Sequence, residues 1–429
     1  MRYDKRCDVP TDSFDDRTVR GVFAGDGGAG GAGPGRWHRP GKAVRRPRYT
    51  AAVGNRTAGV RTPRSGVRRL GGARPRWWCA VGILAAAAVL PGRGVAGLAY
   101  PWWRREQDVA GGWVNRKRAL FVRRLSEILQ LAESEVVDRL CLDRRPGVRV
   151  NRLSPLGVAA IHHAIADLGL TLDPLDWCPD GYLLRGDKRV LSRSEVFGGG
   201  HAYIQNISSL VPALALAPAP DESIIDLCAA PGGKTAHIAA LVGNEARLWA
   251  NDGIAPRLEK LRAVTRQFHV RLAETSCHPA QYADKFITER FDRVLLDAQC
   301  SGEGLVDLRS SAALRYWTEQ RVIDYGWLQR KMLVAACRLL RPGGVLVYST
   351  CTFGPEENEA PLSYLLRHHP VEVCPIEVDI DGFAPDAWRP GLRHWRTETF
   401  HPALADARRI LPGPAFEGFF VCKLRKLPG

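Results

Sequence analysis

Residues 223–241 read SIIDLCAAPGGKTAHIAAL, which is an apolar strand-like run followed by a turn of small residues and a helix-like run. Ala229, Ala230, Gly232 and Gly233 keep the turn free of bulky side chains, so backbone N–H groups at the start of the helix can approach a ligand closely. The turn is neither a GxGxxG fingerprint nor a GxxxxGK[ST] phosphate loop. The stretch therefore predicts a nucleotide-like cofactor at the end of a strand in an α/β sheet.

Three later apolar runs have the composition of buried strands, namely RLWAND at 247–252, DRVLLDA at 292–298 and VLVYST at 345–350. Helix-like segments separate them, and this alternation is typical of a parallel, doubly wound sheet. Asp252 stands at a strand end, where a carboxylate can accept hydrogen bonds from both hydroxyls of a ribose. On these features NAD, another nucleotide and S-adenosylmethionine all fit. The alternatives are a helix cap for Asp252 and a solvated helix position for Lys234.

Two cysteines follow strand ends, Cys300 in FDRVLLDAQCSGEG and Cys351 in RPGGVLVYSTCTFGPEENE. Parallel strands gather their carboxyl ends at one edge of the sheet, so both thiols are expected to face one crevice, together with Asp297. The alternative is that each cysteine is a small buried hydrophobe and that PEENE, residues 355–359, is an ordinary acidic helix start. The remaining cysteines of the patterned region are interpreted as packed residues: Cys141, Cys178, Cys228, Cys277, Cys337, Cys374 and Cys422.

The net charge of +16 is unevenly placed. Residues 1–113 hold 21 Lys and Arg against 8 Asp and Glu, and residues 114–429 hold the remaining 40 against 37. The body of the protein is thus nearly neutral, and any nucleic-acid surface must be local. The 11 cysteines are odd in number and include no CxxC pair. We therefore expect no metal site, no disulfide framework, and reduced thiols in a cytoplasmic protein.

The chain divides into three regions by pattern. Residues 1–113 form a basic, low-complexity extension that is expected to be disordered, because it buries too little apolar surface, or to reflect an over-extended gene start. Its apolar run 77–90 is shorter than the ~20 residues that span a bilayer, so no membrane partner is expected; a membrane or targeting role of residues 77–103 is the alternative. Residues 114–200 are expected to form a small α+β domain with a helix over 119–140. Residues 201–429 are expected to form a catalytic domain of a monomer.

The chain resembles the Sun/Fmu (Nop/Sun, RsmB/RsmF-like) family of RNA 5-methylcytosine methyltransferases over roughly residues 115–427. The resemblance lies in the ordered strings DLCAAPGGKT, ANDGIAPRLEKLR, FDRVLLDAQCSGEG, LQRKMLVAACRLLRPGG and YSTCTFGPEENE, and in RILPGPAFEGFFVCKLRK, which is similar to the family's closing hairpin. It implies a class I S-adenosylmethionine-dependent methyltransferase fold preceded by a small RNA-binding domain. It also implies methyl transfer to carbon 5 of cytosine in structured RNA, ribosomal rather than transfer RNA. An RNA-binding ribosome-assembly factor with little turnover, a transfer-RNA methyltransferase and a DNA cytosine methyltransferase are the alternatives.

The resemblance implies roles for individual residues. Cys351 would add to carbon 6 of cytosine as the nucleophile, and Cys300 would assist release of the methylated base. Asp297 would contact the flipped cytosine, and Lys234 would line the same pocket. The implied S-adenosylmethionine site comprises Cys228, Ala229, Ala230, Pro231, Gly232, Gly233, Lys234, Asp252, Arg257 and Asp297.

Several basic residues of the small domain are candidates for contacts with the RNA backbone. They are Arg149, Arg152, Lys188, Arg189 and Arg193. The alternative is an ordinary solvated charge cluster. A base inside a helix hides its carbon 6, so the target cytosine is expected to be looped or flipped out.

Two positions depart from the family pattern. The family has DAPC where this chain has DAQC, so Gln299 lacks the fixed φ of proline, and we expect activity to be retained. The family usually carries an acidic residue after the third strand of the sheet. Here Ser276 stands near that position and Asp284 lies later in the chain, so one cofactor contact is expected to be lost.

Overall fold

The computed structural model describes residues 102–380, 384 and 386–428, with side chains from Asn115 onward. The described residues all belong to one compact unit. The expectation of a disordered extension as far as residue 113 is wrong at its end, because helix α1 (Trp102–Leu129) begins directly after Pro101. Within α1 there is no proline, and Arg, Glu, Gln and Leu favour a helix. The rest of the extension, including the run 77–90, lies outside the described residues.

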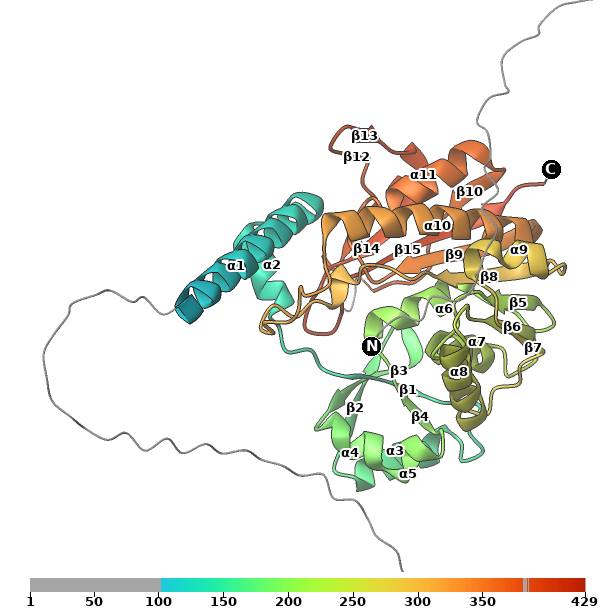
Figure 1. Ribbon diagram of the computed structural model, residues 1–429. Helices are drawn as coiled ribbons and strands as arrows, with labels where there is room; N and C mark the ends of the chain where they lie inside the picture. Colours follow the sequence, from blue (N-terminus) through green and yellow to red (C-terminus); the bar gives the residue numbers. More distant parts are fainter. Residues whose placement is uncertain (1–101, 381–383, 385, 429) are drawn as a thin grey trace, which may run out of the picture. The chain divides into compact units, whose positions relative to one another are not determined.

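A large mixed sheet forms the centre of the described chain, and it confirms the predicted doubly wound topology (Figure 1). Its five parallel strands are β5 (Ser223–Asp226), β6 (Arg247–Asn251), β7 (Glu274–Ser276), β8 (Phe291–Asp297) and β9 (Leu340–Thr350). The closing hairpin is present as β14 (Arg408–Ile410) and β15 (Phe419–Lys426), with β15 antiparallel to β9. Two short strands complete the sheet, β10 (Val371–Cys374) beside β15 and β11 (Trp388–Pro390) beside β14. The order β11-β14-β15-β9-β8-β5-β6-β7 places β8 and β9 next to each other.

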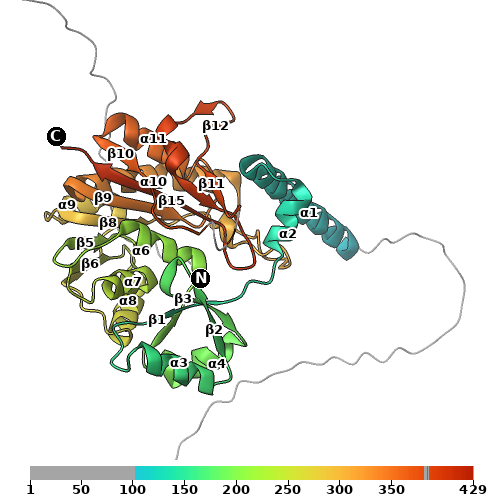
Figure 2. The same cartoon turned by 180° about the vertical axis from the view of Figure 1, so that it is seen from behind.

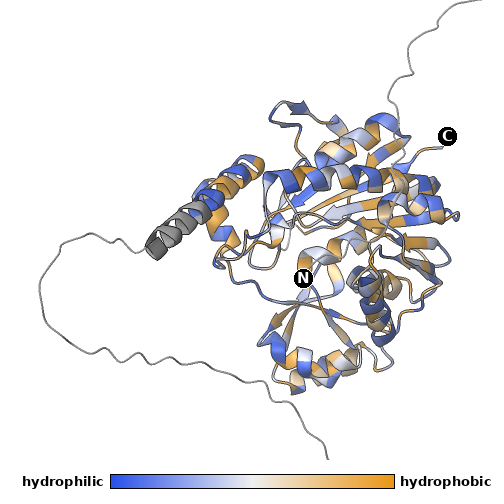
Figure 3. Cartoon of the chain, in the orientation of Figure 1, coloured by the Kyte–Doolittle hydropathy of each residue, from blue (hydrophilic) through white to orange (hydrophobic). Residues whose placement is uncertain are grey.

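Each face of this sheet packs against helices because successive side chains of a strand point to opposite faces. Ile224, Leu295 and Val347 belong to a cluster with α6 (Val211–Leu216) and α7 (Gly233–Leu241). Their neighbours Ile225 and Leu296 belong to a second cluster with the helices of the other face, α10 (Glu319–Leu339) and α11 (Glu359–His368). Figure 2 shows the reverse view, and Figure 3 shows apolar residues on the strands and mixed polarity on the covering helices. Helix α8 (Ala255–Gln267) and helix α9 (Ala283–Phe286) flank the same layers. None of the helices in the described part of the chain is long and apolar enough to cross a bilayer.

A second, antiparallel sheet lies within the range expected for the small α+β domain. Its strand order is β2 (Thr171–Leu175), β3 (Cys178–Arg185), β1 (Gly147–Val150) and β4 (Ala202–Ile204). One face is covered by the apolar side of α3 (Val158–Asp167), α4 (Lys188–Arg193) and α5 (Glu195–Gly198). The opposite face carries Tyr203, whose ring lies against the backbone of Gly233 at the start of α7. The small sheet thus contributes to the surroundings of the glycine turn.

The helix expected over 119–140 is two helices, and their packing differs from the expectation. Gln130 has a positive φ of 54°, which ends α1, and a second helix α2 (Glu133–Leu140) follows. Phe121 and Leu125 of α1, with Leu140 of α2, share a core cluster with the strands β8 and β9 rather than with the small sheet. The boundary expected at residue 114 is therefore wrong for this segment, because its apolar stripe is buried against the large sheet.

Candidate active site

The two thiols expected at neighbouring strand ends lie side by side. Cys300 follows β8 and Cys351 follows β9, and their Sγ atoms are 3.1 Å apart. A hydrogen bond with the Cys351 side chain, together with burial, raises the pKa of the Cys300 thiol well above its ordinary value.

Asp297 and Lys234 form a half-buried ion pair beside the thiols. The Lys234 Nζ donates to Asp297 Oδ2 over 2.8 Å, and Ser349 Oγ donates to Asp297 Oδ1 over 2.7 Å. Burial alone would lower the pKa of Lys234, but the charge and hydrogen bond of Asp297 outweigh it and raise that pKa above its ordinary value. Both carboxylate oxygens are thus held in place by an ammonium group and a hydroxyl.

A cavity of about 190 Å³ opens next to this pair. It is lined by the glycine turn and by the segment that follows β4, namely by Tyr203, Ile204, Gln205, Asn206, Ser209, Asp226, Cys228, Ala229, Ala230, Pro231, Gly233, Lys234 and Asp297. Asp226 is fully buried and accepts from Thr235 Oγ1 through Oδ2 (2.7 Å), while its Oδ1 has no hydrogen-bond partner within the described part of the chain. Burial raises the pKa of Asp226 to about 7. Burial likewise raises the pKa of the Cys228 thiol, which agrees with its interpretation as a packed residue.

Asp252 and Arg257 close the other side of the glycine turn. Asp252 is buried, and its Oδ2 lies 3.3 Å both from the backbone N of Ala230 and from Arg257 Nη2. Arg257 Nη2 also donates to the Ala230 carbonyl over 2.7 Å. The Asp252 Oδ1 accepts from Ile254 N at the start of α8, so the capping alternative describes part of its contacts. The contacts join the turn to α8.

The turn itself requires glycine at one position. Gly232 has φ +121°, and a Cβ there would lie 3.0 Å from Val264 Cγ1. A side chain at this position would meet both backbone strain and a collision with α8. The space for close approach to the backbone, as expected from the sequence, is present.

The third strand ends in a polar residue without charge. Ser276 is the last residue of β7, and its Oγ donates to Asn251 Oδ1 over 2.9 Å. Asp284 lies in α9 and forms an ion pair with Arg338 at 3.1 Å. Asp284 therefore faces a helix on the α10 side of the sheet and does not take the place of the missing acidic residue.

The candidates for RNA backbone contacts divide into one correction and four open predictions. Arg149 is wrong as a surface contact, because its side chain is fully buried. It lies on the inner strand β1, where its Nε donates to Gln205 Oε1 at 3.4 Å and its guanidinium stacks over Tyr203 at 5.9 Å. Four candidates remain at or near the surface: Arg152, which pairs with Asp180; Arg189, which pairs with Asp187; and Lys188 and Arg193.

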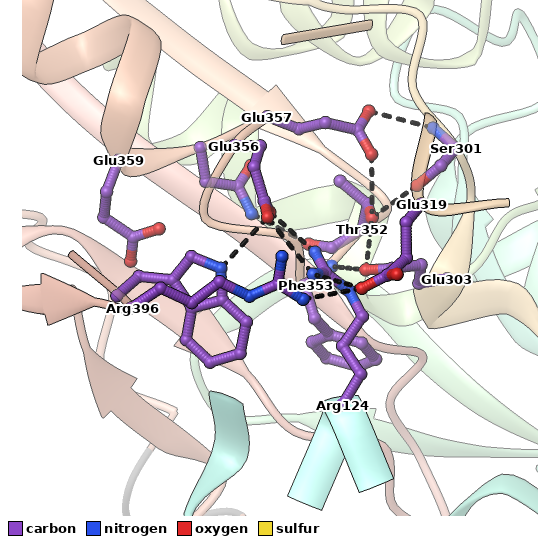
Figure 4. A network of polar contacts seen from close by, with 12 residues as sticks. Arg124, Ser301, Glu303, Glu319, Thr352, Phe353, Glu356, Glu357, Glu359 and Arg396 are labelled. Carbon is purple, nitrogen blue, oxygen red and sulfur yellow. Dashed lines mark hydrogen bonds and ion pairs between the residues drawn. The ribbon is translucent and has the colours of Figure 1, made fainter. Parts of the chain in front are cut away.

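The acidic helix start at 355–359 is buried and connects the two thiol loops (Figure 4). Glu357 Oε2 accepts from the backbone N of Ser301, next to Cys300, over 2.9 Å. Ser301 Oγ lies 2.8 Å from Oγ1 of Thr352, next to Cys351. Burial, with the charge of nearby Glu303 as the second cause, raises the pKa of Glu357 to about 8. The alternative of an ordinary acidic helix start is therefore wrong for PEENE.

Arg124 of α1 reaches into the same network (Figure 4). Its guanidinium donates to both carboxylate oxygens of Glu356, at 3.1 and 2.6 Å, and lies 3.6 Å from Glu303. Glu303 in turn accepts from Trp317 Nε1 over 2.9 Å. Nothing in the helical pattern of α1 predicts Arg124, but the strings SGEG and PEENE contain the acidic residues that bind it.

Comparison with known proteins covers the segment that carries this site. A family model described as "16S rRNA methyltransferase RsmB/F" matches residues 213–425. Ribosomal RNA small subunit methyltransferase F of Klebsiella pneumoniae (strain 342) is 35% identical over 290 residues, which are 66% of this chain and 57% of that protein. The 28S rRNA (cytosine(4447)-C(5))-methyltransferase of Homo sapiens is 32% identical over 311 residues, 70% of this chain and 36% of that protein. A crystal structure of a methyltransferase homolog from Pyrococcus horikoshii superimposes with a TM-score of 0.59 at 29% identity, covering 68% of this chain and 90% of that one.

Proposed function

Because the chain belongs to the Sun/Fmu (RsmB/F) family of methyltransferases, we propose that it transfers a methyl group from S-adenosylmethionine to carbon 5 of cytosine in RNA. The chain spans 57% and 36% of the length of the two curated relatives. One observation carries the proposal. Two thiols lie 3.1 Å apart at the same sheet edge as the Asp297–Lys234 pair.

The glycine turn fits the cofactor. The backbone of Gly233 and residues 228–231 line the cavity, and a buried carboxylate oxygen of Asp226 at the same cavity has no hydrogen-bond partner among the described residues. We propose that residues 228–234 with Asp252 and Arg257 hold S-adenosylmethionine, whose sulfonium supplies an electrophilic methyl group.

The thiols suit the chemistry that cytosine requires. Carbon 5 of cytosine is a poor nucleophile, and addition of the Cys351 sulfur to carbon 6 makes it enamine-like. The proton that Cys351 gives up on addition ends on cytosine N3, and the carboxylate of Asp297, oriented by Lys234 and Ser349, is placed to accept a hydrogen bond from the resulting N3–H. The methylated carbon 5 then gives up its proton to solvent, and the electron pair of that C–H bond re-forms the 5,6 double bond as the sulfur of Cys351 leaves carbon 6 and takes back the proton held on N3. Cys300, whose Sγ lies 3.1 Å from that of Cys351, is placed to hydrogen-bond the departing sulfur and so to assist this release.

The substrate part of the proposal is ribosomal RNA. The names of the two relatives, from Klebsiella pneumoniae and Homo sapiens, refer to rRNA, and transfer RNA is the alternative substrate. We also propose that the protein is a cytoplasmic monomer that needs no membrane partner.

The experiment that tests the activity is transfer of a labelled methyl group from S-adenosylmethionine to total RNA from cells that lack the gene, followed by bisulfite sequencing. The wild type is expected to produce 5-methylcytosine, Cys351→Ala none, and Cys277→Ala, which removes an exposed thiol elsewhere, the wild-type amount. Labelled transfer RNA would select the alternative substrate. Absence of any label with intact cofactor binding would favour an RNA-binding assembly factor with little turnover.

The separate roles proposed for Cys351 and Cys300 can be tested by the formation of a covalent adduct between the protein and RNA. Cys300→Ala should leave the protein covalently joined to its RNA, because release is impaired after addition has occurred. Cys351→Ala should form no adduct. Equal loss of adduct in both variants would contradict the assigned roles.

A further inference from the structure

Helices α10 and α11 cover one face of the large sheet (Figure 1). Aromatic and basic side chains of these two helices, together with two residues of the segment 280–286 that contains α9, line two surface hollows. We call the following residues the α10 strip: Tyr282, Lys285, Trp327, Arg330, Lys331 and Tyr364. Two adjoining hollows of about 620 and 400 Å³ share Trp327, Arg330 and Tyr364. The strip is therefore hollowed rather than flat.

The aromatic rings of the strip face solvent and carry cations against them. Trp327 is 60% exposed and Tyr282 is 40% exposed. The Arg330 guanidinium lies 3.2 Å from the ring centroid of Tyr364 and 5.4 Å from that of Trp327, and Lys285 Nζ lies 5.1 Å from the Tyr282 ring. Exposed rings beside cations are the platforms on which unpaired bases stack, with phosphates neutralised next to them.

The positive charge of the strip is not cancelled within the described residues. Arg330, Lys331 and Lys285 form no ion pair with any described carboxylate. Of the three carboxylates that line the two hollows, Glu356 pairs with Arg124 and Asp284 with Arg338, so Glu398 is the one carboxylate there without an ion pair among the described residues. The strip therefore presents free cations to a polyanion.

The strip also meets the active-site edge of the sheet. The larger hollow is lined by Glu356, which belongs to the buried helix start that connects the Cys300 and Cys351 loops. An extended strand that leaves the thiols at this edge can continue along the groove between α10 and α11. The uncancelled charge, the exposed rings and the position next to the active-site edge are all features suited to single-stranded RNA.

We infer that the α10 strip binds single-stranded RNA that flanks the target nucleotide, by stacking bases on Trp327 and Tyr282 and by pairing phosphates with Arg330, Lys331 and Lys285. The inference rests on the proposed RNA substrate. A protein partner that docks on Trp327 is the rival occupant.

The test is the affinity of a short, labelled uridine oligoribonucleotide, measured by fluorescence anisotropy over a range of salt concentrations. Trp327→Ala should raise Kd about tenfold, because one base loses its stacking platform, whereas Trp327→Phe should stay near the wild type. The double variant Arg330→Ala/Lys331→Ala should raise Kd and reduce the slope of log affinity against log salt by up to about 1.4. The matched control Lys260→Ala/Arg266→Ala removes two exposed charges from α8 and should change neither quantity.

Three results would overturn the inference: no binding by the wild type, unchanged affinity in the strip variants, or an equal loss in the α8 control. Unchanged affinity would assign the exposed Trp327 to a protein contact instead. Methyl transfer by the same proteins keeps the two proposals apart. If the proposed methyl transfer is correct but the α10 strip does not bind RNA, the wild type methylates RNA while the strip variants bind RNA with unchanged affinity. If the α10 strip binds RNA but the proposed methyl transfer is incorrect, the affinity for RNA still depends on Trp327, although neither the wild type nor any variant transfers a methyl group.

Discussion

Replacing Arg124 by Met should destabilise the protein strongly, although the residue lies on a helix that precedes the entire site. The Arg124 side chain is 2% exposed and lies within 4 Å of carboxylates of Glu303 and Glu356, the former fully buried. Methionine keeps the apolar stem but leaves these carboxylates without their cation. Removal of one partner from a buried ion pair costs about 3–5 kcal/mol, because the remaining charge stays desolvated. At ~2.1 cal/mol/K of unfolding entropy per residue, that corresponds to a fall in melting temperature of about 4–7 °C.

The adjacent residue provides a matched control. Arg123 is 72% exposed, and its only ion pair among the described residues is with Glu133 at 3.8 Å. Arg123→Met makes the same chemical change on the same helix, and a surface pair of this kind contributes about 0–1 kcal/mol. Urea unfolding followed by circular dichroism should separate the two variants by more than about 2 kcal/mol. Equal losses in both variants would refute the reasoning that Arg124 neutralises the buried carboxylates.

Three other substitutions test the site. Glu357 has a pKa of about 8 in the fold against an ordinary value of 4.5, so the folded chain keeps a proton that the unfolded chain releases. As the pH rises from 4.5 to 8, the wild type should therefore lose stability relative to Glu357→Gln, by up to about 1.4 kcal/mol per pH unit. Urea unfolding at several pH values measures this, and a stability difference that does not change with pH would contradict it. Asp297→Asn keeps the shape but removes the charge that pairs with Lys234; methyl transfer should fall about 10²- to 10⁴-fold, with cofactor affinity by calorimetry as the control. Gln299→Pro should leave the free energy of unfolding and the rate of methyl transfer unchanged, because the Gln299 amide N–H donates no hydrogen bond within the described residues. A decrease of more than about 1 kcal/mol in the free energy of unfolding would show that the backbone at Gln299 is incompatible with proline.

The parts of the fold that the sequence predicts are those with a local signal. Apolar runs that end in polar or small residues locate β5, β6, β8 and β9, because buried parallel strands must be apolar throughout. The same strand ends place Cys300 and Cys351 together, since neighbouring parallel strands finish at one edge. The break after Leu129 has no comparable signal, because Gln130 adopts a positive φ without glycine or proline nearby.

The sequence does not predict which charged residues are buried, because the local pattern does not show whether a charged side chain faces solvent or the interior. Arg123 and Arg124 are neighbours of one type, yet one is exposed and the other buried. Arg149 belongs to a basic cluster in the sequence but lies inside, because it alternates inward on β1. Its burial is visible only once the small sheet is placed against α7.

The buried carboxylates explain how the thiol pair comes to be so close. In parallel strands the backbones run about 4.8 Å apart, and Asp297 of β8 is in register with Ser349 of β9. The Sγ atoms are nevertheless 3.1 Å apart, so the segments that follow the two strands turn toward each other. The contacts that hold them in that position are those of Glu357 with Ser301 and of Ser301 with Thr352. The thiol spacing is therefore set by polar contacts of the PEENE and SGEG segments. The glycine turn is stabilised separately, by the contacts of Asp252 with the backbone N of Ala230 and with Ile254 N at the start of α8.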